Sequence, residues 1–504
     1  MLRVALVLPA SLAAAVARAA PEDDPAALLA GQAARSGAVD RFLGDGEWGG
    51  AALAWRWRAL SGAEELAPWM EARLAPELRA IDAPERLVLA LDPAVGAAFG
   101  RLPPVNQGGD VEAGLLSLRA GAQGRALWRG FEAVLAPEVG LDLDAGGAAA
   151  GFLHGTAWGA WRGERLLVGF GMRDRWLGPG RQGSLLLSDH ARPAPLGTVA
   201  GNAHLPGKLA VLGRWRLETS WGWLQRPRED VQHPGLMLWD ARWLPVPWIE
   251  LGATRMALFG GEGRPPTPFW QLIVPLDPHV EGDPDLSEPD QDEIASLDAR
   301  LCLPLGRWLG GPVRYVEGWW QYGAEDVIAR KLLGVSVPSL AGVANLWGAE
   351  AAAGRWVLTY EGARVFDDYF RWYTGHRVYH DGFTQDGLVL GDAIGGDAMS
   401  TWVRLGFYPL PWGAELRWEQ VRRVGVVESL GENLLALASD EVVLGGEARC
   451  WYLLRGGGRW YAAYGLQHVD GLDFVPGAET WRHRLAVGWV PGPFARSTGA
   501  RLAR

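Results

Sequence analysis

The stretch that decides the fold is GLMLWDARWLPVPWIELGATRMALFGGEGRPP, residues 235–266. Its first half alternates an apolar set with a set that carries full charges: Met237, Trp239, Ala241 and Trp243 against Leu238, Asp240 and Arg242. A side-chain period of two predicts a β-strand with one apolar and one polar face. Neither Pro245 nor Pro247 can donate a ladder hydrogen bond, so the strand should end at this turn and a second strand should leave from Trp248.

The same hairpin pattern recurs toward the C-terminus, in TWVRLGFYPLPWGAELRWEQVRR (401–423) and CWYLLRGGGRWYAAYGLQ (450–467). A soluble β-sandwich would produce a similar alternation, with its polar set facing water. A membrane barrel is favoured because the apolar set carries Trp and Tyr at strand ends, while the opposite set carries full charges. Closure into a barrel also pairs every backbone group within lipid. The sequence predicts an all-β transmembrane barrel over residues 110–490, with Trp239 and Trp418 facing lipid.

Long polar segments alternate with the short turns, and DPHVEGDPDLSEPDQDE (277–293) is the clearest of them. Its acidity suggests a divalent cation, but it lacks the ordered spacing of a calcium loop, so a solvated extracellular loop is the stronger interpretation. Arg255, in the preceding predicted strand, is a charged residue at an unexpected position, because it shares the predicted lipid-facing set with Leu251. A β-bulge near Gly252, or a position at the barrel rim, would accommodate it.

The two ends of the chain differ from the repeating part. MLRVALVLPASLAAAVARAAPEDD combines a basic residue, a short apolar run and small residues, which predicts a signal peptide over residues 1–19. Every later apolar stretch is interrupted, which excludes helical membrane proteins. Residues 20–109 are expected to form a small helical periplasmic segment, although several of its stretches could instead be first strands. Residues 491–504 are expected to be a C-terminal tail.

Composition narrows the function. The net charge of −10 and the pI near 5.5 argue against a nucleic-acid partner, because phosphate binding needs a clustered basic surface. Cys302 and Cys450 are the only cysteines; Cys302 shares the set of Asp298 and Arg300 and should face inward without a disulfide. The chain has no nucleophile elbow, no His-Glu-x-x-His spacing and no phosphate loop. We expect no catalytic residue, no metal site and no cofactor.

Five separated stretches carry a resemblance to a known family: RWLGPGRQGSLLLSDHARPAP (175–195), RWLPVPWIELGATRMALFGGEGRPP (242–266), QDEIASLDAR (291–300), WWQYGAEDV (319–327) and YHDGFTQDGLVLGDAIGGDAMS (379–400). Together they resemble the Wzi family of capsule-assembly outer-membrane proteins. The resemblance implies a barrel of about eighteen strands with a helical bundle toward the periplasm. It also implies a lectin that attaches capsular polysaccharide or exopolysaccharide to the cell surface. Outer-membrane lipids, lipopolysaccharide and the barrel-assembly machinery would be its other partners.

The first of these stretches supplies the predicted lumen residues: Arg175, Trp176, Arg181, Asp189 and Arg192. Its glycine turn, 178–180, permits a close backbone approach. The arginines could bind carboxylates of an acidic sugar, with Trp176 stacking on a ring. The favoured alternative is that they pair with inward acids such as Glu250, Asp298 or Glu350 and help to fill the barrel.

A second set of residues lies near the predicted long loops and is expected to contact polysaccharide: Glu262, Arg264, Trp270, Tyr369, Trp372, Tyr373 and His376. Aromatic rings in this set could stack on sugars, but an aromatic girdle at the outer interface would give the same pattern. The alternative function is a porin-like channel for small solutes. A lumen that is plugged by paired Arg and Glu would argue against the channel.

Overall fold

The computed structural model describes residues 87–100, 115–144, 147–163, 165–204, 207–225, 227–267, 291–332, 335–365, 372–374, 376–409, 411–427, 435–436, 440–454, 458–491 and 494–497. The predicted signal peptide, residues 1–19, lies outside these ranges, and so does most of the predicted helical segment. No helix within them is both long enough and apolar enough to cross a membrane.

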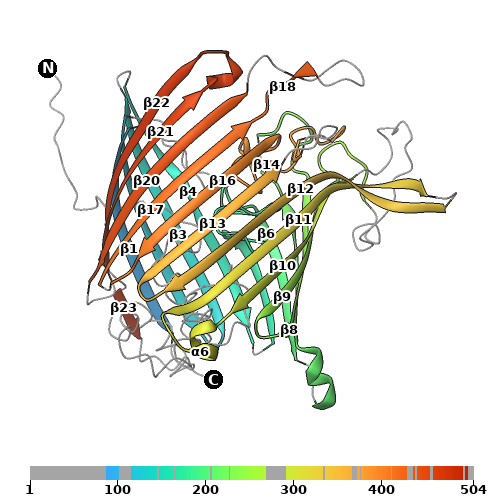
Figure 1. Ribbon diagram of the computed structural model, residues 1–504, viewed down its shortest axis with the longest axis horizontal. Helices are drawn as coiled ribbons and strands as arrows, with labels where there is room; N and C mark the ends of the chain where they lie inside the picture. Colours follow the sequence, from blue (N-terminus) through green and yellow to red (C-terminus); the bar gives the residue numbers. More distant parts are fainter. Residues whose placement is uncertain are drawn as a thin grey trace.

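The described chain is a closed antiparallel β-barrel (Figure 1). Its wall strands are β1 (Val88–Gly100), β2 (Leu116–Trp128), β3 (Phe131–Asp144), β4 (Gly147–Arg162), β5 (Leu166–Met172), β6 (Pro195–His204), β7 (Arg214–Trp223), β8 (Gly235–Val246), β9 (Ile249–Phe259), β10 (Gln291–Leu303), β11 (Val313–Leu332), β12 (Val335–Ala353), β13 (Trp356–Val365), β16 (Ala398–Phe407), β17 (Trp412–Arg423), β20 (Glu441–Leu453), β21 (Arg459–Asp470), β22 (Glu479–Val490) and β23 (Phe494–Ser497).

The barrel closes through β1, which pairs with β2 on one side and with both β22 and β23 on the other. Because β22 and β23 follow each other along β1, they share one position in a wall of 18 strands. The barrel therefore extends beyond the predicted bounds of 110–490. Residues 88–100 are a strand, which decides between the two possibilities that the sequence left open for this stretch, and β23 lies in the predicted tail.

The period of two governs which side chains face the lumen. In β8, Asp240 and Arg242 are 6% and 7% exposed, whereas Trp239 points to the outer face. In β17, Trp418 is 43% exposed on the outer face, while Glu415 is 3% exposed. The predictions that Trp239 and Trp418 face outward, as residues of a lipid-facing surface, are confirmed. Cys302 faces inward and forms no disulfide, as predicted.

Arg255 stays on the outer face, and the rim interpretation explains it better than the bulge. The pairing of β8 with β9 runs without a shift from Gly235 opposite Phe259 to Trp243 opposite Leu251. Arg255 lies near the end of β9 that leads into a long loop, and its guanidinium forms an ion pair with Glu293 on β10. Pairing with a carboxylate offsets the cost of a cation on this surface.

The two ends of the barrel differ in their connections (Figure 1). One end, the turn end, has short connections, among them the helices η2 (Gly207–Leu212) and α6 (Leu305–Leu309). The other end, the loop end, carries the long segments, among them the small hairpins β14 (Thr384–Gln385) with β15 (Leu388–Val389) and β18 (Val426–Val427) with β19 (Leu435–Ala436), and the helix η3 (Leu472–Phe474). In barrels of the outer-membrane type the short turns lie on the periplasmic side and the long loops lie on the extracellular side.

Candidate functional site: a plug of loops and the surface above it

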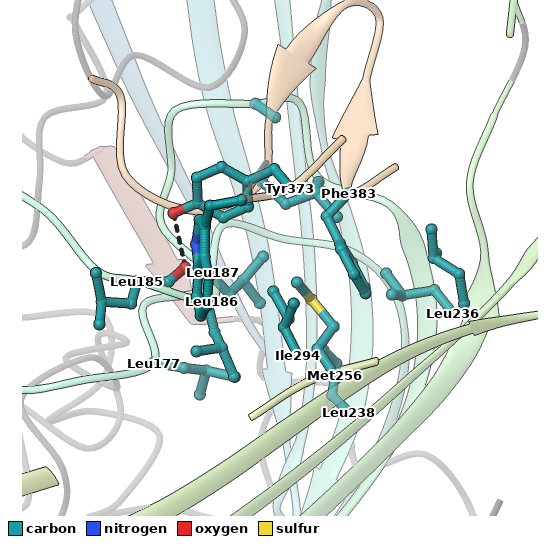
Figure 2. Close-up of a cluster of buried hydrophobic side chains, with 14 of the residues drawn as sticks. Leu177, Leu185, Leu186, Leu187, Leu236, Leu238, Met256, Ile294, Tyr373 and Phe383 are labelled. Atoms are coloured by element: carbon teal, nitrogen blue, oxygen red, sulfur yellow. Dashed lines mark hydrogen bonds between the residues drawn. The ribbon is translucent and has the colours of Figure 1, made fainter. Parts of the chain in front are cut away.

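Three segments fold into the loop-end half of the lumen. We call them the first plug segment (173–194), the second (224–234, without 226) and the third (372–397, without 375). They contribute to one hydrophobic cluster with inward residues of the wall (Figure 2). The labelled members are Leu177, Leu185, Leu186, Leu187, Leu236, Leu238, Met256, Ile294, Tyr373 and Phe383. Apolar side chains fill this half of the barrel as they would fill a protein core.

The first plug segment is anchored to two separate strands of the wall by its arginines. Arg175 donates to Glu218 at 2.6 Å and to Ser220 at 2.8 Å, both on β7. Arg181 donates to Glu317 on β11 at 2.5 Å. The prediction that these arginines lie inside the barrel and pair with carboxylates is confirmed.

The acids suggested as partners from the sequence were wrong, however. Glu250, Asp298 and Glu350 pair instead with arginines of other wall strands, at 3.9, 2.6 and 3.0 Å respectively: Arg300, Arg242 and Arg404. These acids face inward as expected, but each lies within reach of an arginine on the adjacent strand or on the next strand but one. The wall therefore neutralises many of its own charges, and two of its paired acids, Glu218 and Glu317, also bind the plug arginines.

Glu361 on β13 is the acid that binds the backbone of the first plug segment. Its carboxylate accepts the backbone N–H groups of Arg181, Gln182 and Gly183 at 2.6, 2.9 and 2.8 Å. The indole N–H of Trp319 donates to the same carboxylate at 3.0 Å. Consecutive backbone donors around one anion form a rigid anion-binding turn. Sequence reasoning missed Glu361, because its inward position is readable from the alternation but its partners in the plug lie 178–180 residues away.

The remaining predicted lumen residues also lie inside or at the mouth of the barrel. The indole of Trp176 donates to the Gly180 carbonyl at 3.0 Å, and a Cβ on Gly180 would lie 2.0 Å from the Gly183 carbonyl oxygen. The predicted close backbone approach at this turn is therefore present. Asp189 is 4% exposed. Arg192 pairs with Asp386 of the third plug segment at 3.4 Å.

Tyr373 connects the first and third plug segments through hydrogen bonds of its hydroxyl group. Its hydroxyl donates to the Leu185 carbonyl at 2.7 Å and accepts the Asp392 backbone N–H at 2.8 Å (Figure 2 shows the first of these bonds). A Cβ on Gly391 would lie 2.2 Å from that hydroxyl, so this position needs glycine. Tyr373 has a φ of 74°, a left-handed conformation that a bulky residue adopts only when its surroundings fix it.

The second plug segment binds the third through a charged turn. Arg228 holds Asp230 with two hydrogen bonds of 2.8 Å and donates to the Gly382 carbonyl at 3.1 Å. Asp381 accepts the Glu229 backbone N–H at 2.6 Å. The three segments are thus interlocked by polar bonds above and around their common apolar cluster.

The structure places the predicted polysaccharide contacts in three different situations. Trp372 and Tyr373 are 2% and 0% exposed in the plug core, so the expectation that they meet a polymer at the surface is corrected. They are buried because their apolar rings complete the cluster with Leu185 and its neighbours. Trp270 and Tyr369 lie outside the described residues. Glu262, Arg264 and His376 are described.

These three residues lie on two loops that touch at the loop end. Glu262 is exposed, and its carboxylate lies 2.9 Å from Nδ1 of His233. The Tyr379 hydroxyl donates to the Gly260 carbonyl at 2.9 Å, which joins the two loops. We call the set His233, Glu262, Arg264, His376, Arg377 and His380 the mouth surface; all are exposed or half-buried.

The comparisons with known proteins agree with this architecture. Residues 112–408, more than half of the chain, match the family described as capsule assembly protein Wzi. The chain belongs to the Wzi family. Over 120 residues it is 31% identical to an uncharacterized 55.8 kDa protein in the cps region of Klebsiella pneumoniae, and this match spans 23% of each protein.

One solved structure shows the same fold as this Wzi-family chain. Wzi of Escherichia coli, described as an outer-membrane carbohydrate-binding β-barrel involved in group 1 capsule assembly, has a TM-score of 0.64 at 19% identity. That comparison covers 93% of this chain and 98% of the E. coli protein. OprD of Pseudomonas aeruginosa has a TM-score of 0.46 at 9% identity, with 82% and 96% of the two chains covered.

Proposed function

We propose that this protein is an outer-membrane barrel that holds capsular polysaccharide or exopolysaccharide at the cell surface. Family membership supports a role in capsule assembly. The single structural observation that carries the proposal is the interlocked plug, because a filled lumen suits a binding platform better than a passage. A rigid plug also gives the loops above it a fixed framework on which a binding surface can be built.

The mouth surface is the proposed contact region, with Glu262, Arg264 and His376 as its described candidates and Trp270 and Tyr369 as candidates beyond it. Its mixture of carboxylate, guanidinium and imidazole groups offers both donors and acceptors to sugar hydroxyls and carboxylates. Each hydrogen bond would add a net gain of only about 0.5–1.5 kcal/mol. Retention would come from many barrels engaging one polymer chain.

The rest of the proposal concerns how the protein reaches and occupies the membrane. Residues 1–19 would direct export and be removed. The barrel-assembly machinery would insert the barrel, and lipopolysaccharide would surround its outer half. No chemistry is assigned to the protein: we propose a holding role without catalysis, cofactor or nucleic acid.

Deletion of the gene tests the proposal directly. The expected result is that polysaccharide appears in the culture medium while its total amount stays the same. Purified protein in detergent should bind the polysaccharide of the producing cell, and Glu262→Gln with Arg264→Gln should weaken that binding. A deletion strain that kept all of its polysaccharide attached would contradict the proposal.

The channel remains the competing function, and ion conductance separates the two. A plugged barrel should show little steady conductance in a planar bilayer. Steady conductance of the unaltered protein, together with an absence of glycan binding, would favour the porin-like channel instead.

A further inference from the structure

The turn end of the barrel is a basic rim in a protein whose net charge is −10. The described residues that connect strands there are 129–130, 163, 165, 207–213, 247–248, 304–312, 354–355, 408–409, 411, 454, 458 and 491, and they contain no Asp or Glu. Five exposed cations lie among them: Arg129, Arg165, Lys208, Arg307 and Arg355. The loop end differs, since its connections carry both signs, with acids such as Glu229, Glu262 and Asp386 among their arginines.

Exposed tryptophans on the outer face mark the depth of this rim. They lie at the ends of the wall strands or in the turns themselves and are 37–57% exposed: Trp161, Trp248, Trp308, Trp356, Trp412 and Trp460. Indole rings gather at the boundary between hydrocarbon and headgroups. The neighbouring cations therefore lie at the level where lipid phosphates lie.

Two short helices of the rim combine apolar and cationic side chains. In η2, Val211 is 79% exposed and Lys208 is exposed beside it; in α6, Leu309 is 79% exposed and follows Arg307. Both elements are held against the barrel. The Trp243 indole donates to the Leu212 carbonyl at 2.7 Å, and Trp248 packs edge-on against Trp308 with ring centroids 5.6 Å apart.

Such a combination suits a membrane interface. Apolar tips enter the acyl region, while cations at the same depth meet headgroups. The arginines are spread from the β2–β3 turn to the β12–β13 turn, whereas a protein partner would need a single contiguous patch. The rim is also continuous with the lipid-facing wall through the tryptophans.

We propose that this basic rim binds the phosphate headgroups of anionic phospholipids in the leaflet at the turn end. Guanidinium groups bind phosphate oxygens in pairs, and ammonium groups bind them as point charges. Anchoring this end would fix the depth and tilt of the barrel. This inference is independent of the polysaccharide proposal, because it concerns the opposite end of the molecule.

Lipid retention by the full-length protein in detergent tests the rim. Native mass spectrometry would compare phosphatidylglycerol with phosphatidylethanolamine on the wild type, on Arg129→Gln/Arg165→Gln/Arg355→Gln and on Lys208→Gln/Arg307→Gln. We expect the wild type to prefer phosphatidylglycerol, and each cation removed to weaken that binding by roughly fivefold. Added salt should weaken the preference further.

Arg422→Gln is the matched control, because Arg422 is an exposed arginine on the outer face at the loop end. It should leave phosphatidylglycerol binding unchanged. Equal retention of both lipids by the wild type would overturn the proposal, and so would an equal loss in Arg422→Gln. If the rim variants lost lipopolysaccharide but kept phosphatidylglycerol, the assignment to phospholipid would be wrong. The altered mobility of folded barrels on unheated gels would show that each variant is folded.

Discussion

The two halves of the lumen contrast along the same strands. In β8 the inward residues Leu236 and Leu238, toward the loop end, are 1% and 2% exposed within an apolar cluster. The next two inward residues, Asp240 and Arg242, lie in a charged network. The neighbouring strands β9 and β10 change in the same way, from Met256 and Ile294 to charged residues near the turn end. An inward position alone therefore does not fix the chemistry of a side chain.

The difference lies in what each half packs against. The loop-end half meets plug segments from distant parts of the sequence, and apolar contact is the means by which such segments hold together. The turn-end half is joined by inward ion pairs between wall strands, such as Arg242 with Asp298 and Arg404 with Glu350. The first half should therefore respond to loss of a plug anchor, and the second to loss of one partner in a pair.

Replacing Glu361 by Leu should give the largest effect. Three buried donors and one half-buried donor lose their acceptor, and each unsatisfied buried donor costs about 1–3 kcal/mol, so the plug should lose at least about 3 kcal/mol of docking free energy. Protease cleavage within residues 173–194 and a rise in single-barrel conductance would report the released plug. Glu361→Gln keeps one acceptor oxygen and should show a smaller change. An unchanged plug in Glu361→Leu would mean that the apolar cluster alone holds it.

Replacing Arg404 by Met tests the turn-end half. Arg404 is 1% exposed and donates to Glu350 at 3.0 Å and to Thr359 at 3.1 Å. Its loss leaves a buried carboxylate without its cation, which costs about 3–5 kcal/mol. Urea unfolding in detergent would measure the change. The double variant Arg404→Met/Glu350→Leu should recover most of the stability, and a double variant as unstable as the single one would contradict the pairing argument.

The sequence predicted the wall better than the plug. Period-two alternation was sufficient to place Trp239, Trp418 and Cys302 on the correct faces, because it depends only on neighbouring residues. It was not sufficient for Tyr373, which shares its aromatic character with surface rings but is 0% exposed. Whether a ring in a loop faces solvent or a plug depends on segments that are far away in sequence.

The partners of the plug arginines could not be predicted either, because they too depend on segments that are far away in sequence. Inward acids are numerous, and choosing Glu218 or Glu317 over Glu250 requires the path of residues 173–194 across the lumen. The strand Val88–Gly100 was ambiguous for a local reason. Its many Ala residues fit a helix as well as a small-residue strand, and pairing with β2, β22 and β23 decides between them.

Replacing Leu258 by Ala probes the apolar half more gently than the loss of Glu361. Leu258 is 0% exposed in the plug cluster, and a buried Leu→Ala change costs about 2–5 kcal/mol because a cavity remains. Leu251 is the matched control, since it lies on the outer face of the same strand and is 36% exposed. Leu251→Ala should cost less because lipid or detergent can fill the space. Thermal unfolding in detergent would compare the stability of the two variants. Equal losses of stability would contradict the presence of a packed core in the lumen.

The smallest expected effect is a pH response of the first plug segment. Burial, followed by the nearby Arg423, lowers the pKa of His190 from 6.5 to about 4. Between these values the unfolded chain takes up a proton that the packed His190 does not, so stability should be complete above about pH 6.5 and should fall as the pH decreases toward about 4. A shift of this size corresponds to at most about 3 kcal/mol, and the partial exposure of the ring reduces the expected loss to about 1–2 kcal/mol.

Asp392 of the third plug segment has the opposite effect of pH on stability, so its contribution must be measured separately from that of His190. Burial raises its pKa from 3.8 to about 6, so the folded state keeps its proton more readily than the unfolded chain and gains stability as the pH falls through about 6. Hydrogen exchange of residues 173–194 at about pH 7 and about pH 5 should therefore be compared in the wild type, His190→Gln and Asp392→Asn. The loss of protection on acidification should be absent in His190→Gln and steeper in Asp392→Asn. If the wild type and His190→Gln responded identically to pH, the buried imidazole would not be the titrating group, and the plug would be held independently of its charge.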